Sequence, residues 1–210
     1  MTASLPLLIY LHGFNSSPQS LKVRLLADAL AGLGLAERLY APQLPHSPAQ
    51  ALALLEQRAA SEALPPVLIG SSLGGFYATA LAQRHGWKAL LINPAVRPSR
   101  WVADYLGEQR NYHSGETWQL TQDFVDQIQQ LECPAPCAPE RYQVWLQTQD
   151  ETLDYRDAVS YYRGCALRVE PGGEHGFQGF AAHIPALLAF AGWPAEYWQD
   201  SAQPQQLRTR

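Results

Sequence analysis

Several short runs of apolar residues occur along the chain, and within them hydrophobic residues do not alternate with polar ones. The first run covers residues 5–11 and is interrupted only by Pro6 and by the partly polar Tyr10. Runs of this kind are typical of strands that are buried on both faces of a parallel sheet. The pattern predicts six strands, at residues 5–11, 38–41, 67–71, 89–93, 142–146 and 166–169.

Segments with helical spacing or helix-capping residues separate these runs. Ser47 can cap a helix whose first residue is Pro48, because proline is favoured at the first helical position. In the first helix, the apolar residues near one stripe are Leu21, Leu25, Ala29 and Gly32. The predicted helices cover residues 20–33, 48–63, 76–85, 121–131, 154–163 and 180–190. Strands that alternate with helices predict an α/β fold, in which helices cover both faces of a mostly parallel sheet.

The alternation stops between Ala95 and Pro139, after the fourth predicted strand. This segment contains the predicted helix at residues 121–131 and four large aromatic residues, Trp101, Tyr105, Tyr112 and Trp118. We interpret residues 95–139 as a lid-like insertion over the carboxyl ends of the strands, within a single domain of residues 1–198. Residues 199–210 are polar and rich in glutamine, and we expect them to form a disordered tail.

Composition narrows the class of protein. A chain of 210 residues is long enough to bury a full core in one domain. Its formal net charge is −4 and it has no block of basic residues, which excludes the usual charge pattern of a nucleic-acid-binding protein. The N-terminus has no basic segment and no apolar run reaches about 18 residues, so we expect neither a signal peptide nor a membrane span. We expect a cytoplasmic protein.

The chain has three cysteines, and an odd number argues against a framework of disulfides. Cys133 and Cys137 are four residues apart, which is a spacing that zinc sites use. Because the sequence has no second pair and only Cys165 remains, we expect no metal site and no cofactor.

The segment Gly70–Gly75 carries the pattern G-x-S-x-G, with Ser72 at its centre. A strand is predicted before it and a helix after it, and strand, turn and helix together are the context of a nucleophile elbow. Glycines two residues before and after the serine permit the sharp turn. The following helix would direct its first N–H groups, and the positive end of its dipole, toward charge that develops beside Ser72. We therefore predict that Ser72 is a nucleophile.

A serine nucleophile needs a base, and the base needs a third group to orient it. In this architecture the order along the chain is serine, acid, histidine. Four histidines follow Ser72, namely His85, His113, His175 and His183. The first is at the far end of the helix after the elbow, the second is in the insertion and the last is inside the final helix. Only His175 follows a predicted strand within a glycine-rich loop, and we predict it as the base.

The acid should follow the preceding strand, where Asp150, Glu151 and Asp154 are all candidates. Asp150 is closest to the end of the strand, and we choose it for that reason. Asp154 is placed to cap the next helix, Glu151 could be a solvated loop carboxylate, and Asp150 itself could form a turn through its side chain.

Two backbone N–H groups should stabilise the oxyanion. One belongs to Leu73, which follows the nucleophile, and the other to the loop after the first strand, where Phe14 is the expected donor. His12 in the same loop is expected to brace it by hydrogen bonding rather than to catalyse. The two loops would adjoin if the chain reverses direction between the first and third strands, which is where open α/β sheets bind ligands.

His12 is also a candidate for the substrate pocket, as are four further residues. Asn93 either lines the pocket or simply ends a strand. Arg97 either holds an acidic group of the substrate or pairs with a protein carboxylate. Trp101 and Tyr105 of the insertion either form a wall of the acyl pocket or pack in the core.

Five motifs together resemble the YqiA-type bacterial esterases, which are small α/β-hydrolases. The motifs are LHGFNSSP at residues 11–18, PQLP at 42–45, GSSLGG at 70–75, NPAVRP at 93–98 and GGEHGF at 172–177. The resemblance covers residues 5–190 and implies a six-stranded parallel sheet that lacks the first two strands of larger relatives. It also implies hydrolysis of carboxylic esters by Ser72, His175 and Asp150. The chain departs from the family pattern at Gln149, where a glycine is usual.

The predicted reaction is acyl transfer in two steps on a small-molecule acyl ester or thioester. One alternative is a thioesterase or acyltransferase that uses the same three side chains. A second alternative is a catalytically silent protein of this fold that binds a ligand or a partner. An intact set of serine, histidine and aspartate argues against the silent protein, because a pure binding protein has no chemical need of it.

Overall fold

The computed structural model describes residues 5–198, and the predicted tail at residues 199–210 lies outside this range. Its centre is a six-stranded sheet with the order β2-β1-β3-β4-β7-β8, in which every neighbouring pair of strands is parallel. The strands are β1 (Leu8–Leu11), β2 (Leu39–Tyr40), β3 (Val67–Ser71), β4 (Lys88–Ile92), β7 (Tyr142–Gln147) and β8 (Ala166–Glu170). The prediction of a six-stranded parallel sheet is confirmed.

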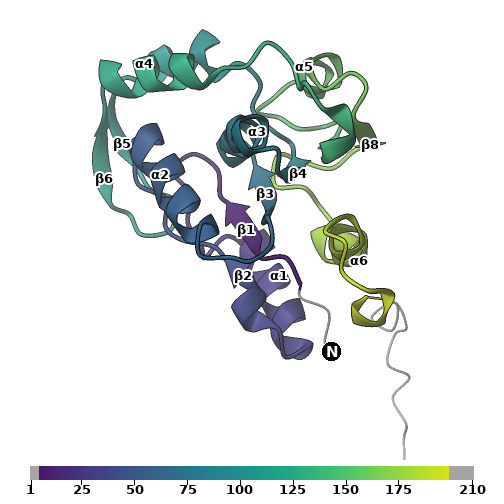
Figure 1. The fold of residues 1–210 in the computed structure, drawn as a ribbon. Coiled ribbons are helices and arrows are strands. Elements are labelled where there is room, and N and C mark those ends of the chain that lie inside the picture. The colour runs from purple at the N-terminus through teal and green to yellow at the C-terminus, as the bar shows by residue number, and fades with distance from the viewer. Residues whose placement is uncertain (1–4, 199–210) are drawn as a thin grey trace, which may run out of the picture.

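Helices cover both faces of this sheet (Figure 1). They are α1 (Leu21–Gly32), α2 (Pro48–Ala59), α3 (Leu73–His85), α4 (Gln122–Leu131), α5 (Tyr155–Tyr161) and α6 (Phe180–Phe190). Side chains of α1 and α6 form one core cluster with the sheet, and those of α2, α3 and α5 form the other. Because both faces are covered, β1 and β3 are buried along their whole length, which explains why their sequences do not alternate.

The buried stripe of α1 differs from the predicted one. Leu21 is 61% exposed and Gly32 is also exposed, although both belong to the predicted stripe. The side chains that α1 buries are Val23, Leu26 and Leu30. Both stripes have helical spacing, and the buried one removes more apolar area from water because its side chains are larger.

Capping residues set several helix ends. The Ser47 hydroxyl caps α2 as predicted and accepts a hydrogen bond from the N–H of Gln50 at 3.4 Å, although the helix ends at Ala59 rather than residue 63. Gly86 ends α3 in a left-handed conformation with a φ of 72°. Asp154 precedes α5 and caps it, so the helix begins one residue later than predicted.

The insertion contains a β-hairpin that the sequence analysis did not predict. Its strands are β5 (Gly107–Arg110) and β6 (Thr117–Leu120), which pair antiparallel with Gln109 opposite Trp118. Both strands are short, and most of their side chains are polar and exposed, so no apolar run marks them. Apolar side chains of the insertion nevertheless join the core cluster of α2 and α3, and they include Val102, Leu120, Phe124 and Ile128.

The strand order places the loops after β1 and β3 side by side. The chain runs from β1 outward to β2 and then returns across β1 to form β3, so Leu11 and Gly70 are register partners at the carboxyl ends. This reversal is the switch point at which open α/β sheets bind ligands, and its predicted position is confirmed. Residues 12–17 follow β1 and contain Phe14, the expected oxyanion donor, so they are called the oxyanion loop below.

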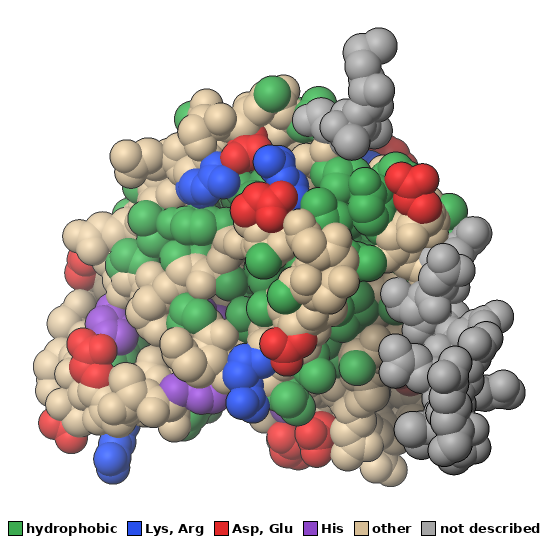
Figure 2. Space-filling view, turned by 90° about the horizontal axis from the view of Figure 1, so that it is seen from below, with side chains coloured by type: hydrophobic (Ala, Val, Ile, Leu, Met, Phe, Trp, Pro, Cys, Tyr) green, Lys and Arg blue, Asp and Glu red, His purple; other side chains and the backbone are tan. Residues whose placement is uncertain are grey.

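The surface carries charges of both signs. On the face shown in Figure 2, the described Lys and Arg side chains are interspersed with Asp and Glu and form no continuous basic patch. Within residues 5–198, no helix combines the length and the apolar character needed to cross a membrane.

Candidate active site

Ser72 lies between β3 and α3, in a backbone conformation that residues other than glycine rarely adopt. Its φ is 55° and its ψ is −124°. The turn requires the flanking glycines, because a Cβ on Gly70 would meet the backbone of Gly74, and a Cβ on Gly74 would meet the carbonyl of Leu11. The backbone N–H of Ser72 donates to the carbonyl of Ile92 at 3.1 Å, which fixes the turn over the end of β4.

His175 lies in the loop between β8 and α6, and its two ring nitrogens contact different partners. Nε2 is 3.0 Å from the hydroxyl oxygen of Ser72. Nδ1 is 2.9 Å and 2.8 Å from the two carboxylate oxygens of Asp150, which lies in the loop after β7. The Asp150 side chain is 2% exposed and that of His175 is 23% exposed. The imidazole ring therefore stands between a hydroxyl and a buried carboxylate.

The other two candidate acids have different contacts. Asp154 accepts a hydrogen bond from the N–H of Arg156 at 2.9 Å, and its carboxylate also pairs with the Arg156 guanidinium, which lowers the pKa of that carboxyl. Glu151 accepts a hydrogen bond from the backbone N–H of His175 at 2.9 Å, which lowers the pKa of Glu151. Glu151 thus contacts the histidine loop and is not a freely solvated carboxylate.

Asp150 also forms a turn through its side chain. Its Oδ1 accepts hydrogen bonds from the N–H groups of Thr152 and Leu153, at 2.9 Å and 2.8 Å. Gln149, just before it, does not have a positive φ, and its N–H donates to the carbonyl of Gly172 at 3.0 Å. The turn therefore does not require the glycine that is usual at this position.

Leu73 and Phe14 hold two free N–H groups near Ser72. Among residues 5–198, neither N–H donates a hydrogen bond to a protein acceptor. Leu73 is the first residue of α3, where unpaired N–H groups concentrate partial positive charge. The two loops are in contact, since a Cβ on Gly13 would lie 3.1 Å from the Cβ of Ser72.

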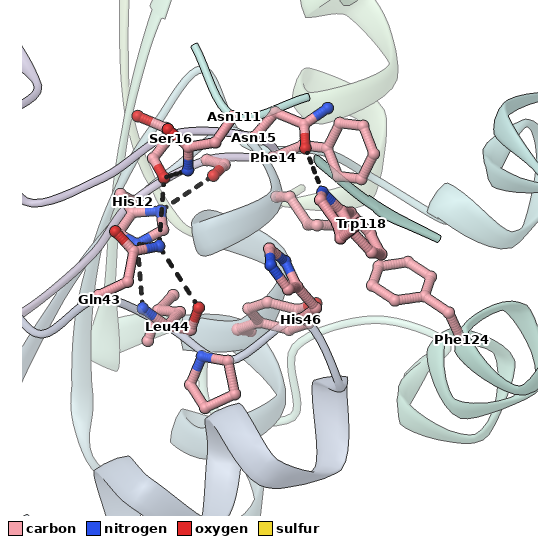
Figure 3. Close-up of a pocket in the computed structure, with 14 residues that line it drawn as sticks. His12, Phe14, Asn15, Ser16, Gln43, Leu44, His46, Asn111, Trp118 and Phe124 are labelled. Atoms are coloured by element: carbon pink, nitrogen blue, oxygen red, sulfur yellow. Dashed lines mark hydrogen bonds between the residues drawn. The ribbon is translucent and has the colours of Figure 1, made fainter. Parts of the chain in front are cut away.

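His12 is buried and bridges two loops, as Figure 3 shows. Its Nδ1 is 3.0 Å from the carbonyl of Gly13, so this nitrogen carries the hydrogen, and Nε2 accepts a hydrogen bond from the N–H of Leu44 at 3.1 Å. Burial lowers the pKa of His12, which favours this neutral form. His12 therefore braces the oxyanion loop, the role expected from the sequence.

Ser72 and His175 open onto a cavity of about 340 Å³. One wall is aromatic and consists of Phe14, Trp101, Tyr105 and Tyr112. The remainder includes Lys22, Thr152 and Gly176. Of the five candidate pocket residues, Trp101 and Tyr105 thus line the same cavity as Ser72, whereas His12 does not. The insertion supplies most of the aromatic wall.

A family model matches most of the chain. The model is that of the Uncharacterised protein family (UPF0227), and it matches residues 7–192. The chain belongs to the UPF0227 family. This result confirms the resemblance to the YqiA-type proteins that the five sequence motifs indicated.

Solved structures share the fold of this UPF0227 member. Est1E from Butyrivibrio proteoclasticus with bound ferulic acid has 16% sequence identity and a TM-score of 0.63, covering 93% of this chain and 88% of that one. The esterase domain of a Rhodothermus marinus protein has 17% identity and a TM-score of 0.65, covering 90% and 88%. Mouse alpha/beta hydrolase domain-containing protein 10 has 13% identity and a TM-score of 0.65, covering 90% and 92%. The fold is therefore that of the α/β-hydrolases.

The other two candidate pocket residues of the UPF0227 chain do not line the cavity. Asn93 is 2% exposed, and its Nδ2 donates to the carbonyls of Glu174 and His175 at 3.0 Å and 3.1 Å. Arg97 points to another part of the surface, where its guanidinium lies 5.8 Å from the ring of Tyr161 and donates to the carbonyl of Pro134 at 3.4 Å. Among the described residues, Arg97 forms no salt bridge and does not line the cavity that contains Ser72, so neither of the two contacts that the sequence suggested is observed.

Gln147 is a residue of the site that the sequence analysis missed. It ends β7 and is 4% exposed. Its side-chain oxygen accepts from the N–H groups of Glu174 and Gln178, at 3.2 Å and 2.8 Å, and its Nε2 donates to the Gln178 carbonyl at 2.9 Å. Its own N–H donates to Oδ1 of Asn93 at 3.0 Å. The signal in the sequence was a glutamine directly after a predicted buried strand. A buried side-chain amide needs hydrogen-bond partners, so Gln147 could have been expected to hold a neighbouring loop.

Asn15 was also missed, and it connects the oxyanion loop to the hairpin. Its Oδ1 accepts a hydrogen bond from the indole N–H of Trp118 at 2.8 Å, which Figure 3 shows, and its Nδ2 donates to Gln109 at 3.2 Å. The backbone carbonyl of Asn15 accepts from the N–H of Tyr112 at 2.8 Å. Asn15 has a φ of 52°, a conformation that asparagine tolerates better than most residues.

The cysteines remain separate thiols. Cys133, Cys137 and Cys165 are all free. In the part of the chain that the structure describes, no three His, Cys, Asp or Glu side chains are grouped so that they could hold a metal ion. Burial raises the pKa of the Cys165 thiol to about 11, so this thiol is a poor nucleophile at neutral pH.

Proposed function

We propose that the protein hydrolyses carboxylic esters, with Ser72 as nucleophile, His175 as base and Asp150 as the acid that orients the ring. The continuous contact from the Ser72 hydroxyl through the His175 ring to the Asp150 carboxylate carries this proposal. With Asp150 accepting from Nδ1–H, Nε2 has a free lone pair that can take the serine proton.

The reaction would proceed through an acyl-enzyme. Ser72 Oγ attacks the ester carbonyl while its proton passes to Nε2 of His175, and the N–H groups of Leu73 and Phe14 stabilise the oxyanion. The bond to the alcohol oxygen then breaks, and His175 protonates the departing alcohol. Water then attacks the acyl-enzyme carbonyl while its proton passes to His175. The bond from the acyl carbon to Ser72 Oγ breaks, His175 returns the proton to Ser72, and the acid is released. No metal or organic cofactor takes part.

The insertion would shape the acyl pocket. Trp101, Tyr105 and Tyr112 present apolar ring surface to the cavity that contains Ser72. Apolar walls with a few polar groups are the usual lining of small-molecule sites. An acyl chain would thus lie against the insertion. The packing of Val102 and Phe124 into the core supports a wall of fixed position.

Labelling with a fluorophosphonate tests the nucleophile directly. The wild-type protein should be labelled at one site and should hydrolyse p-nitrophenyl butyrate, and Ser72→Ala should lose the label and nearly all turnover. Ser160→Ala, on an exposed surface of α5, is the control and should behave as wild type. Labelling that persists in Ser72→Ala would contradict the proposal. A parallel panel of acyl thioesters and acceptor alcohols separates ester hydrolysis from the thioesterase and acyltransferase alternatives.

A further inference from the structure

A lysine lines the Ser72 cavity and has no part in the chemistry proposed above. Lys22 is the second residue of α1, and its side chain reaches the cavity wall beside His175. Its ammonium donates one hydrogen bond, to the carbonyl of Gly176 at 2.7 Å. Two of its three N–H donors remain, so the group can still bind a ligand.

No carboxylate of the described residues forms a salt bridge with Lys22. The acidic groups whose charge acts on Lys22 are Glu174 and Asp150. The Asp150 carboxylate is already bonded to His175, and Glu174 accepts from Nε2 of Gln178 at 3.2 Å. The positive charge of Lys22 is therefore not neutralised by direct contact with the protein.

The position of this charge is unfavourable for stability. Lys22 lies in the first turn of α1, where the helix dipole disfavours a cation. Burial also lowers the pKa of Lys22 to about 8, because the ammonium loses contact with water. A partly buried charge in a cleft, without a paired carboxylate, is a feature of functional sites more than of structural ones.

We propose that Lys22 determines specificity by binding an anionic group on the substrate, so that the preferred ester also carries a carboxylate or a phosphate. The proposal rests on the ester hydrolysis proposed above. The apolar part of such a substrate would lie against the aromatic wall, and its anionic group would lie at the Lys22 ammonium, beside Gly176. An ammonium is a compact point charge that suits either anion.

A second role for Lys22 must be separated from this one. The hydrogen bond to Gly176 also anchors the loop that carries His175. Loss of the anchor would slow the hydrolysis of every substrate by a similar factor, whereas loss of an anion-binding group would affect charged substrates alone. The ratio of kcat/KM between a charged and a neutral substrate therefore separates the two roles.

The experiment uses two matched pairs of esters. In the first pair, monoethyl glutarate carries a terminal carboxylate where ethyl 5-methylhexanoate carries an isopropyl group. In the second pair, 2-(butyryloxy)ethyl phosphate is compared with its neutral dimethyl ester. The ratio of kcat/KM, charged over neutral, is measured for wild type, Lys22→Met and Lys22→Arg, with circular dichroism to verify folding.

Wild type should favour the charged ester of at least one pair by about tenfold or more, the factor expected for one charge-assisted hydrogen bond. Lys22→Met should abolish that preference, and Lys22→Arg should retain most of it. The pair that shows the preference identifies the anion as carboxylate or phosphate.

Three results would overturn the inference or its basis. A wild-type ratio near or below one in both pairs contradicts anion recognition, and this measurement needs no variant to fold. An unchanged ratio in Lys22→Met, with both rates reduced, makes Lys22 a loop anchor only. Failure of wild type to hydrolyse any of the four esters, or p-nitrophenyl butyrate, counts against ester hydrolysis itself.

Discussion

The two loops that converge on Ser72 are held in place by different parts of the molecule. The histidine loop, residues 171–178, is bonded to two buried amides at the ends of central strands, Asn93 and Gln147. The oxyanion loop is bonded to the β5–β6 hairpin of the insertion through Asn15 and Ser16, in addition to the bond between His12 and Leu44. The sheet thus positions the proposed base, and a peripheral hairpin positions one of the proposed oxyanion donors.

This difference predicts that the two halves of the site respond differently to mutation. The two amides that hold the histidine loop are 2% and 4% exposed, so breaking one of their contacts leaves unsatisfied groups and reduces both stability and turnover. Asn15 and Trp118, which link the oxyanion loop to the hairpin, are partly exposed, so water can replace a lost partner there and the fold should tolerate the change. Mutations there should act mainly on transition-state stabilisation.

The largest effect is expected at the carboxylate behind the base. Asp150→Asn should reduce turnover by orders of magnitude with little change in Tm, because the amide favours the wrong tautomer of His175; the corresponding change in serine proteases costs about 10⁴ in kcat. Asp154→Asn should stay within a few-fold of wild type, since both residues cap helices well. The measurement is turnover of p-nitrophenyl butyrate at neutral pH. A large loss in Asp154→Asn, with Asp150→Asn active, would show that the acid is assigned wrongly.

The next effect is expected at the buried amide of Asn93. Asn93→Asp keeps the shape and the tolerance of its φ of 40°, but it removes the two N–H donors that hold Glu174 and His175. The free energy of unfolding should fall by about 1–3 kcal/mol for each group left unsatisfied, and kcat should fall with it. Urea unfolding and turnover are measured together. Wild-type stability in this variant would mean that the amide does not hold the loop.

A smaller effect is expected at the hairpin. Trp118→Phe removes the indole N–H that donates to Asn15 and keeps the aromatic packing against Phe14 and Phe124. Loss of one oxyanion donor costs about 10²–10³ in kcat, so a displaced donor should cost less, about tenfold. KM and Tm should change little, and affinity for a boronate transition-state analogue should fall in parallel with kcat. Gln119→Ala, exposed on the same strand, is the control. A fall in Tm without a fall in kcat would remove the link between hairpin and oxyanion loop.

The aromatic wall should affect selectivity rather than rate. Trp101→Ala and Tyr105→Ala enlarge the cavity, so the ratio of kcat/KM for long over short acyl chains should change several-fold while Tm changes less than it does in Asn93→Asp. Hydrolysis of p-nitrophenyl acetate, butyrate and octanoate measures this ratio. An identical chain-length profile in both variants would place the acyl chain elsewhere.

The last effect is a pH dependence at Lys22. Its pKa of about 8 leaves the ammonium charged below that pH and neutral above it, and the nearby Glu174 and Asp150 both favour the charged form. KM for the preferred anionic ester should therefore rise as the pH increases through about 8, whereas KM for its neutral twin should not. The twin also corrects for titration of other groups in the site. Parallel curves for the two esters would contradict a role for the Lys22 charge.

The sequence predicts the parts of this molecule that depend on local pattern. The apolar runs predicted the six strands, and the glycines around Ser72 predicted the sharp turn between strand and helix. The order serine, acid, histidine, combined with the rule that loops gather at strand carboxyl ends, predicted that Ser72, Asp150 and His175 would lie close together. Their side chains do lie within hydrogen-bonding distance.

The parts that the sequence did not predict depend on contacts between distant residues. Asn93 and Glu174 are 81 positions apart, and Asn15 and Trp118 are 103 apart. Neither pair leaves a periodic signal in its own neighbourhood. The same is true of β5 and β6, whose alternation is masked by polar side chains on both faces, and of α1, where two stripes with the same spacing compete and volume decides between them.

The strained backbone at Ser72 has a consequence for the evolution of this chain. Its φ and ψ fall where glycine is unstrained, so Ser72→Gly should relieve about 1–3 kcal/mol of backbone strain. The greater conformational entropy of glycine in the unfolded chain would offset about 0.5–1 kcal/mol of that gain in stability. Ser72→Ala keeps the strain, so its Tm should stay close to that of wild type and below that of Ser72→Gly. If Ser72 is the nucleophile, a lineage that lost the need for the reaction would gain stability by one substitution. On that condition, the serine at this position favours chemistry at the expense of stability.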